Sequence, residues 1–379
     1  MRRSHFARIA VLTVLAAAAF GPAPAAAQQP VGFVHGFLAD GGGWGMLPIN
    51  LMDRFPIRAT TPTLGWSDPL ATQASRLQNE LVNTGFTNPV LIGHSNGGLI
   101  SRQTTRLMQT SGVMTIGTLH GGAPLAGNLG AVEWVAAVTF FSNYFASAYA
   151  NWLLWGCWDC YSYDPWTWWI TYIAASYDIN MAYVGAAAFP ITIGLGIYSE
   201  NVRNDMVPWS GFLADLNSGG NLGREASEVP VRVGIGSSVW TNYGLMWNGI
   251  IPSYWGELTS LQYNAAYWSY LGFIFNSFFT YWDDPYFWDK QFAGWLFLDA
   301  AYVDWSIDPW WCQIIGAWAG YCTESDAIVP LWSQQFPGWG NVTNYTIYGP
   351  SHTQEKQSGE VYYATSYALQ NNFGLPPRY

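Results

Sequence analysis

The sequence predicts an α/β fold, with a mostly parallel sheet flanked by helices and a large aromatic-rich cap built from two insertions. Three observations favour this fold class. Short apolar runs alternate with segments of helical spacing between residues 31 and 127, as expected when helices connect parallel strands. One of these runs, residues 89–98, breaks into Gly-x-Ser-x-Gly, which is typical of a strand that ends in a sharp turn before a helix. Beyond residue 130 the alternation stops and aromatic residues dominate.

The first half of the sheet is predicted from residues 31–119. Residues 31–35 form a short apolar run, and a glycine-rich loop then leads into the segment 44–55. Apolar side chains recur at helical spacing over residues 70–82, and the pattern ends before Gly85, which predicts a helix. The other elements expected here are strands over 57–64, before Ser95 and over 113–119, and a helix from Gly98 to about Met108.

Two insertions are expected to interrupt this core. Most of the 23 tryptophans lie between residues 134 and 318. We assign residues 130–199 and 237–321 to the cap, and residues 28–129, 200–236 and 322–379 to the core. The late core elements are expected to be strands over 229–235, 328–329 and 342–348, followed by a closing helix over 361–369.

The N-terminal residues have the pattern of a secretory signal peptide. Arginines at positions 2, 3 and 8 precede an apolar stretch over residues 9–20, and three alanines at 25–27 form a small-residue cleavage site. The apolar stretch is too short to cross a bilayer. We therefore expect residues 1–27 to be removed and the mature protein to be secreted or periplasmic.

The mature chain is strongly acidic. Loss of the leader leaves 11 basic against 24 acidic residues and a net charge of −13. Nucleic acids and anionic bilayers repel such a chain, which excludes nucleic-acid binding. Residues 181–198 are nearly uncharged, but Pro190 and three glycines favour a buried or interfacial segment over a membrane span.

The four cysteines suit an exported, oxidised protein. Cys157 and Cys160 are close in sequence, and so are Cys312 and Cys322, so two local disulfides are expected. The spacing Cys157-Trp-Asp-Cys160 also fits redox and zinc patterns, but the chain has no second Cys-x-x-Cys pair and no clustered histidines. We therefore expect no metal site and no cofactor.

Ser95 is the candidate nucleophile, and the chain offers five histidines as its base. His94 adjoins the serine, and its side chain is expected to point away from the reactive side. His35 and His120 follow the first strand and the strand after the nucleophile, and His5 leaves with the signal peptide. His352 comes late, directly after a predicted strand, where a loop at the carboxyl edge of the sheet can bring its imidazole over the serine. The alternative interpretation is a surface histidine in a turn.

Two aspartates compete as the acid that orients this base. Asp326 precedes the apolar pair 328–329, and Asp205 lies in the similar string Asn-Asp-Met-Val-Pro. Asp205 comes before the strand over 229–235, whereas Asp326 comes after it, one connection before His352. This order favours Asp326, because the acid should follow the later core strand.

The oxyanion of an acyl-transfer reaction requires two main-chain N–H groups. One is expected from Asn96, the residue after the nucleophile, and the other from Phe37 in the loop after the first strand. Gly36, just before Phe37, lets the backbone approach the substrate. A simple turn is the alternative interpretation of His35-Gly36.

The chain resembles the α/β-hydrolase lipases and esterases of bacteria, including relatives of the lipid-remodelling acylhydrolases. The resemblance covers residues 31–127, 200–236 and 322–379, and Ala327 departs from it where such families often have glycine. It implies an α/β-hydrolase fold, the triad Ser95, Asp326 and His352, and Phe37 and Asn96 as oxyanion donors. The matching segments are residues 34–37, Gly93-His-Ser-Asn-Gly97, His120-Gly-Gly-Ala-Pro124, 210–217, Asp326-Ala-Ile-Val-Pro330 and 351–352.

Together these features predict a serine hydrolase that cleaves carboxylic esters of hydrophobic substrates through an acyl-enzyme. An aromatic cap can bind acyl chains and contact a lipid interface, although the same aromatics would also serve simply to pack the cap. A polyester or phospholipid hydrolase and an acyltransferase are alternatives on the same triad. The alternative from another class is a non-catalytic surface protein that binds lipid or glycans.

Overall fold

The computed structural model describes residues 28–37, 39–128, 200–238, 269–273, 287–288, 291–299, 302, 306, 325–326, 328–338, 340–350, 352 and 355–378. These residues form a six-stranded sheet in the order β2-β1-β3-β4-β5-β6, and every neighbouring pair of strands is parallel. The strands are β1 (Gln29–Val34), β2 (Ile57–Thr60), β3 (Val90–His94), β4 (Gly112–Ile116), β5 (Arg232–Ser238) and β6 (Val342–Tyr348).

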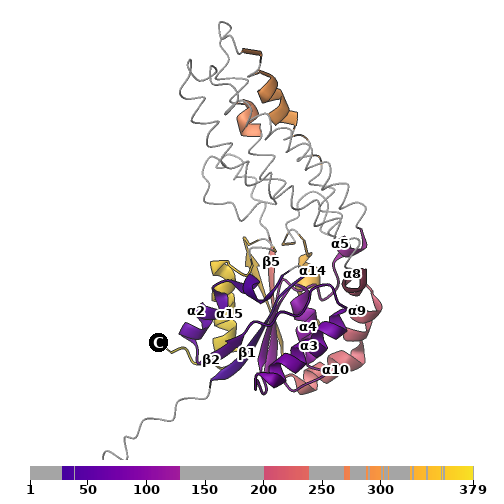
Figure 1. Cartoon of the computed structure of the whole chain (residues 1–379), viewed down its shortest axis with the longest axis vertical. Helices are drawn as coiled ribbons and strands as arrows, with labels where there is room; N and C mark the ends of the chain where they lie inside the picture. Colours follow the sequence, from indigo (N-terminus) through magenta and orange to yellow (C-terminus); the bar gives the residue numbers. More distant parts are fainter. Residues whose placement is uncertain are drawn as a thin grey trace, which may run out of the picture.

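Helices cover both faces of this sheet (Figure 1). On one face lie α2 (Leu47–Arg54) and α15 (Gly359–Asn371). On the other lie α3 (Leu70–Asn83), α4 (Asn96–Thr104), α9 (Gly211–Leu216) and α10 (Gly219–Glu228). The other labelled elements are the short helices α5 (Pro124–Gly127), α8 (Glu200–Met206) and α14 (Leu331–Gln334) and the 3-10 turn η1 (Gly41–Trp44), and residues 269–273 and 291–299 are helical as well.

Alternation along the strands builds two hydrophobic cores, one on each face of the sheet. In β1, Val31 and Phe33 pack on the side of α2 and α15, whereas Val34 packs on the side of α3 and α4. The same division holds in β3, where Ile92 joins the first core and Leu91 the second. A sheet buried on both faces requires such near-continuous apolar runs, which is why the strands could be recognised in the sequence.

The structure corrects one predicted element. Residues 328–329 do not form a strand: the main chain makes a single antiparallel bridge between Ser325 and Pro330 and then enters α14. The Asp326 carboxylate accepts the N–H groups of Ile328 at 2.9 Å and Val329 at 2.6 Å. Because these two N–H groups donate to the aspartate side chain, they cannot donate to a neighbouring strand, and the segment forms a turn.

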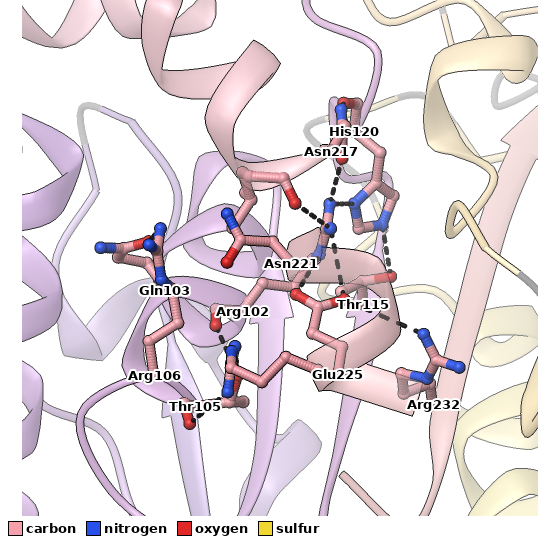
Figure 2. A network of polar contacts seen from close by, with 12 residues as sticks. Arg102, Gln103, Thr105, Arg106, Thr115, His120, Asn217, Asn221, Glu225 and Arg232 are labelled. Atoms are coloured by element: carbon pink, nitrogen blue, oxygen red, sulfur yellow. Dashed lines mark hydrogen bonds and ion pairs between the residues drawn. The ribbon is translucent and has the colours of Figure 1, made fainter. Parts of the chain in front are cut away.

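A buried ion pair fixes the helix that follows the serine. Arg102 of α4 donates through Nε and Nη2 to the two carboxylate oxygens of Glu225 in α10, at 3.1 and 3.3 Å. Both side chains are buried, and Figure 2 shows Arg102 between Glu225 and His120. Arg102 also donates to Asn217 Oδ1 and the Leu216 carbonyl, so its buried charge is well compensated.

Several sequence-based predictions concern residues outside the described set. These are the signal peptide, all four cysteines, the segment 181–198 and the insertion 130–199, while the insertion 237–321 is described only in short pieces. Within the described ranges, no helix combines the length and apolar character needed to cross a membrane.

Candidate active site

Ser95 occupies the sharp turn between β3 and α4. Its φ and ψ of +59° and −132° are costly for any residue other than glycine. The neighbouring glycines make the turn feasible: a Cβ on Gly93 would lie 2.4 Å from the Gly97 carbonyl oxygen, and one on Gly97 would lie 2.2 Å from the Val34 carbonyl oxygen. The Gly-x-Ser-x-Gly pattern is thus a steric requirement of this turn.

His352 and Asp326 are joined through both side chain and main chain. The ring nitrogen Nδ1 of His352 lies 2.7 Å from Asp326 Oδ2, and the His352 N–H donates to the Asp326 carbonyl at 2.9 Å. A carboxylate only accepts hydrogen bonds, so Nδ1 carries the proton and Nε2 is left with a lone pair in the neutral imidazole. This tautomer is the one that a general base needs.

The structure separates the two competing aspartates. Asp326 is fully buried, and its second oxygen is held by the turn at residues 328–329. The Asp205 carboxylate instead accepts the Leu70 N–H at 2.9 Å, at the start of α3. Asp205 therefore binds a free N–H group at the start of a helix and not an imidazole.

The environment of His352 favours its protonated form. Burial by itself lowers the pKa of this imidazole, but the adjacent Asp326 carboxylate, its hydrogen bond and the charge of Glu355 together raise the pKa to about 9. An imidazole held in this way is a stronger base than free histidine, and it is charged at neutral pH.

The residue next to the serine, His94, contacts His352 directly. The ring centroids of His94 and His352 are 4.8 Å apart, and His94 Nε2 lies 3.0 Å from the His352 carbonyl oxygen. No hydrogen bond joins the Ser95 hydroxyl to the imidazole in the described part of the chain. Such contacts are often long without substrate and tighten in the reacting complex.

The two expected oxyanion donors both lie close to the serine turn. Asn96 is the first residue of α4, where a main-chain N–H has no partner within the helix. Phe37 follows Gly36, on which a Cβ would lie only 2.8 Å from the Ser95 Cβ. Phe37 also packs edge-on against Trp66, with ring centroids 5.5 Å apart, which helps to fix the loop.

The remaining described histidines have structural roles. His35 Nε2 accepts the Leu64 N–H at 3.0 Å, and its Nδ1 lies 2.9 Å from the Gly36 carbonyl oxygen. His120 Nδ1 accepts from Arg102 at 3.2 Å, and its Nε2 contacts the Thr115 hydroxyl at 3.0 Å (Figure 2). Burial lowers the pKa of both rings, and the Arg102 charge lowers that of His120 further. Both rings are therefore neutral and fixed.

Sequence reasoning missed Glu355. This side chain is fully buried, and its Oε2 lies 3.0 Å from His94 Nε2 and 3.6 Å from His352 Nδ1. Its other oxygen makes a short hydrogen bond with the Ser237 hydroxyl at the end of β5. The available signal was an acidic residue three positions after the candidate base in a chain with only 10% charged residues.

His94, His352 and Glu355 are also the described residues that come closest to a metal-binding group. All three are buried, and one ligand atom from each lies within 4.8 Å of the others. Their mutual hydrogen bonds account for this proximity without an ion.

Comparisons with known proteins give distant structural matches only. No family model matches the chain, and no curated protein matches it. A Bacillus licheniformis lipase in its mature form is 13% identical, with 93% of each chain covered and a TM-score of 0.40. A thermophilic esterase from Thermogutta terrifontis is 12% identical, with 91% of this chain and 89% of that chain covered and a TM-score of 0.38. An α/β hydrolase from a deep-sea metagenome library is 11% identical, with 92% and 90% covered and a TM-score of 0.36.

At these sequence identities and TM-scores, the matches do not establish the fold by themselves. The class follows from the described residues: a parallel sheet with helices on both faces, and a strained serine at the turn between β3 and α4. His352 follows β6, so both side chains belong to loops at the carboxyl ends of parallel strands. This is the architecture of the α/β-hydrolase fold.

Proposed function

We propose that the protein is a secreted serine hydrolase that cleaves carboxylic esters of hydrophobic substrates. Ser95 is the nucleophile, His352 the general base and acid, and Asp326 the residue that orients the imidazole. The observation that carries the proposal is the geometry of His352 and Asp326, whose side chains meet at 2.7 Å, so that Nε2 holds the lone pair once the imidazole is neutral.

The reaction follows from these roles. As the Ser95 oxygen attacks the ester carbonyl carbon, its proton passes to His352 Nε2. The negative charge that develops on the carbonyl oxygen is stabilised by the N–H groups of Asn96 and Phe37. The imidazolium then gives its proton to the leaving alcohol, and a water molecule activated by the same base hydrolyses the acyl-enzyme.

The proposed substrate class comes from the aromatic composition of the insertions. Trp and Tyr side chains offer apolar faces to acyl chains and partition well at a lipid–water interface. We therefore expect glycerides or other water-insoluble esters to be better substrates than acetyl esters.

The test is hydrolysis of chromogenic esters of increasing acyl length by the wild-type protein and by Ser95→Ala. We expect turnover that grows from acetyl to octanoyl esters and is lost in the variant, with a kcat reduction of up to ~10⁶-fold. A sharp preference for acetyl esters would contradict the hydrophobic substrate class. Equal activity in Ser95→Ala and the wild type would contradict the assignment of Ser95 as the nucleophile.

A further inference from the structure

The buried carboxyl group of Glu355 is closely surrounded by Gly117, Ser237 and His94. Gly117, at the end of β4, has a φ of +53°, and a Cβ on it would lie 2.0 Å from Glu355 Oε2. The absence of a side chain at this position therefore makes room for the carboxyl group. Ser237 contacts one of its oxygens and His94 the other.

His94 links this group to the loop of the proposed base. Burial lowers the pKa of His94 well below its usual value, and the charge of His352 lowers it further, so the ring is neutral. The His352 carbonyl oxygen, 3.0 Å from Nε2, can only accept a hydrogen bond, so Nε2 carries the ring proton and donates it; Glu355 Oε2 lies at the same distance from Nε2. One imidazole thus holds the main chain of His352 and the side chain of Glu355 together.

Burial, neighbouring charges and a hydrogen bond together set the pKa of Glu355. Burial raises its pKa to about 8, and the negative charge of Asp326 acts in the same direction. The charge of His352, the Ser237 hydrogen bond and the charge of Lys356 lower it. Glu355 is therefore mostly a neutral acid at pH 7, and it gains its negative charge as the pH rises through about 8.

We infer that Glu355 is a positioning residue of the hydrolytic site: it fixes the His352 loop through His94 and, when ionised, favours the protonated imidazole. The inference rests on the proposed function only for its consequence in catalysis. Asp326 then orients the imidazole and is the main charge that raises its pKa, while ionised Glu355 raises that pKa further, so His352 becomes a free base only at higher pH.

The direct test is a titration of His352 by NMR in protein labelled with ¹³C-histidine, a residue of which the chain has only five. His352→Ala assigns the resonance. The variants are Glu355→Gln, which retains the shape without the charge, and Glu360→Gln, which removes an exposed charge from the first turn of α15. We expect the pKa of His352 to fall by roughly 1 unit in Glu355→Gln and to stay at the wild-type value in Glu360→Gln. An unchanged pKa in Glu355→Gln would overturn the inference.

Ser237→Ala keeps the test decisive if Glu355→Gln does not fold. Loss of the hydroxyl raises the pKa of Glu355, so the carboxyl group stays neutral to higher pH and the pKa of His352 again falls. An unchanged value in Ser237→Ala would count against the inference in the same way.

The titration needs no turnover, so its outcome is independent of the proposed function. In an active enzyme the rise of kcat/KM with pH should move to lower pH by the same amount in Glu355→Gln. A lower kcat with an unmoved pH profile would show a merely structural role and would also overturn the inference.

Discussion

At the scale of single residues, Asp326 and Asp205 show how similar sequence settings lead to different roles. Each aspartate lies three or four positions before a proline, yet of the two only Asp326 contacts an imidazole among the described residues. Asp326→Asn should keep the turn at residues 328–329 but lose the charge that holds His352 in its reactive tautomer. We expect kcat to fall by up to ~10⁴-fold, measured with the best chromogenic ester.

Asp205→Asn is the matched control. Asparagine can still accept the Leu70 N–H through its side-chain oxygen. Both activity and the free energy of unfolding should therefore stay close to wild type. A large loss of activity in this variant, with Asp326→Asn unaffected, would reverse the assignment of the acid.

The pH dependence of kcat/KM also belongs to this scale. His352 must be neutral to accept the Ser95 proton, and its surroundings raise its pKa to about 9. Activity should therefore rise with pH through the weakly alkaline range, as measured by initial rates at low substrate concentration. In Asp326→Asn the rise should move to lower pH, because the main charge that raises this pKa is gone.

The role of Glu355 could not be predicted from the sequence. Its proximity to His94 depends on β3 and the loop after β6 lying side by side, and these are 261 residues apart in the chain. Ser95 and His352 could be singled out as candidates because a local pattern and a short list of histidines pointed to them.

At the scale of elements, the glycine turn can be tested by its steric demand. A Cβ on Gly97 would lie 2.2 and 2.5 Å from the carbonyl oxygens of Val34 and His35, and backbone atoms cannot move aside without shifting β1. Gly97→Ala should therefore lower the free energy of unfolding by about 2 kcal/mol or more, measured by urea denaturation, and should reduce activity.

Gly223→Ala provides the comparison. Gly223 lies inside α10, and no atom lies within 4 Å of where its Cβ would be. Alanine should be neutral there or stabilise the protein by up to about 1 kcal/mol. Equal destabilisation by both substitutions would show that the turn at Ser95 has no special steric requirement.

The predicted and observed extents of two segments show which features of the structure a local sequence pattern can predict. Strand β6 was predicted over the residues it occupies, because alternation continues along its length. The apolar pair 328–329 was predicted as a strand and is a turn, because the side chain of Asp326 competes for its N–H groups. Apolar character identified a buried segment, but the local hydrogen bonds decided its conformation.

At the scale of the whole molecule, the buried pair Arg102–Glu225 joins segments 123 residues apart. Glu225→Gln would leave the Arg102 charge buried and poorly compensated. We expect a loss of about 3–5 kcal/mol in the free energy of unfolding.

The pair Arg106–Asp215, whose aspartate is exposed, joins the segment just after α4 to α9, with an N–O distance of 2.6 Å. Asp215→Asn should cost no more than about 1 kcal/mol, because solvent screens this pair. Equal losses in the two variants would mean that burial does not set the strength of these contacts.

The fold class could be predicted because parallel strands buried on both faces leave apolar runs separated by helical periods. The long-range polar contacts could not, since nothing local in the sequence pairs Arg102 with Glu225. The same limit applied to the site: the residue types were recognisable, but the neighbours that tune their ionisation were not.

The most direct test of the account is labelling with a fluorophosphonate probe, followed by mass spectrometry to locate the modified residue. A reagent of this kind reacts with a serine only where a base and oxyanion donors converge on its hydroxyl. We predict a single adduct on Ser95, greatly slowed labelling in His352→Ala and none in Ser95→Ala. No adduct in the folded wild-type protein, or an adduct on another serine, would contradict the central claim.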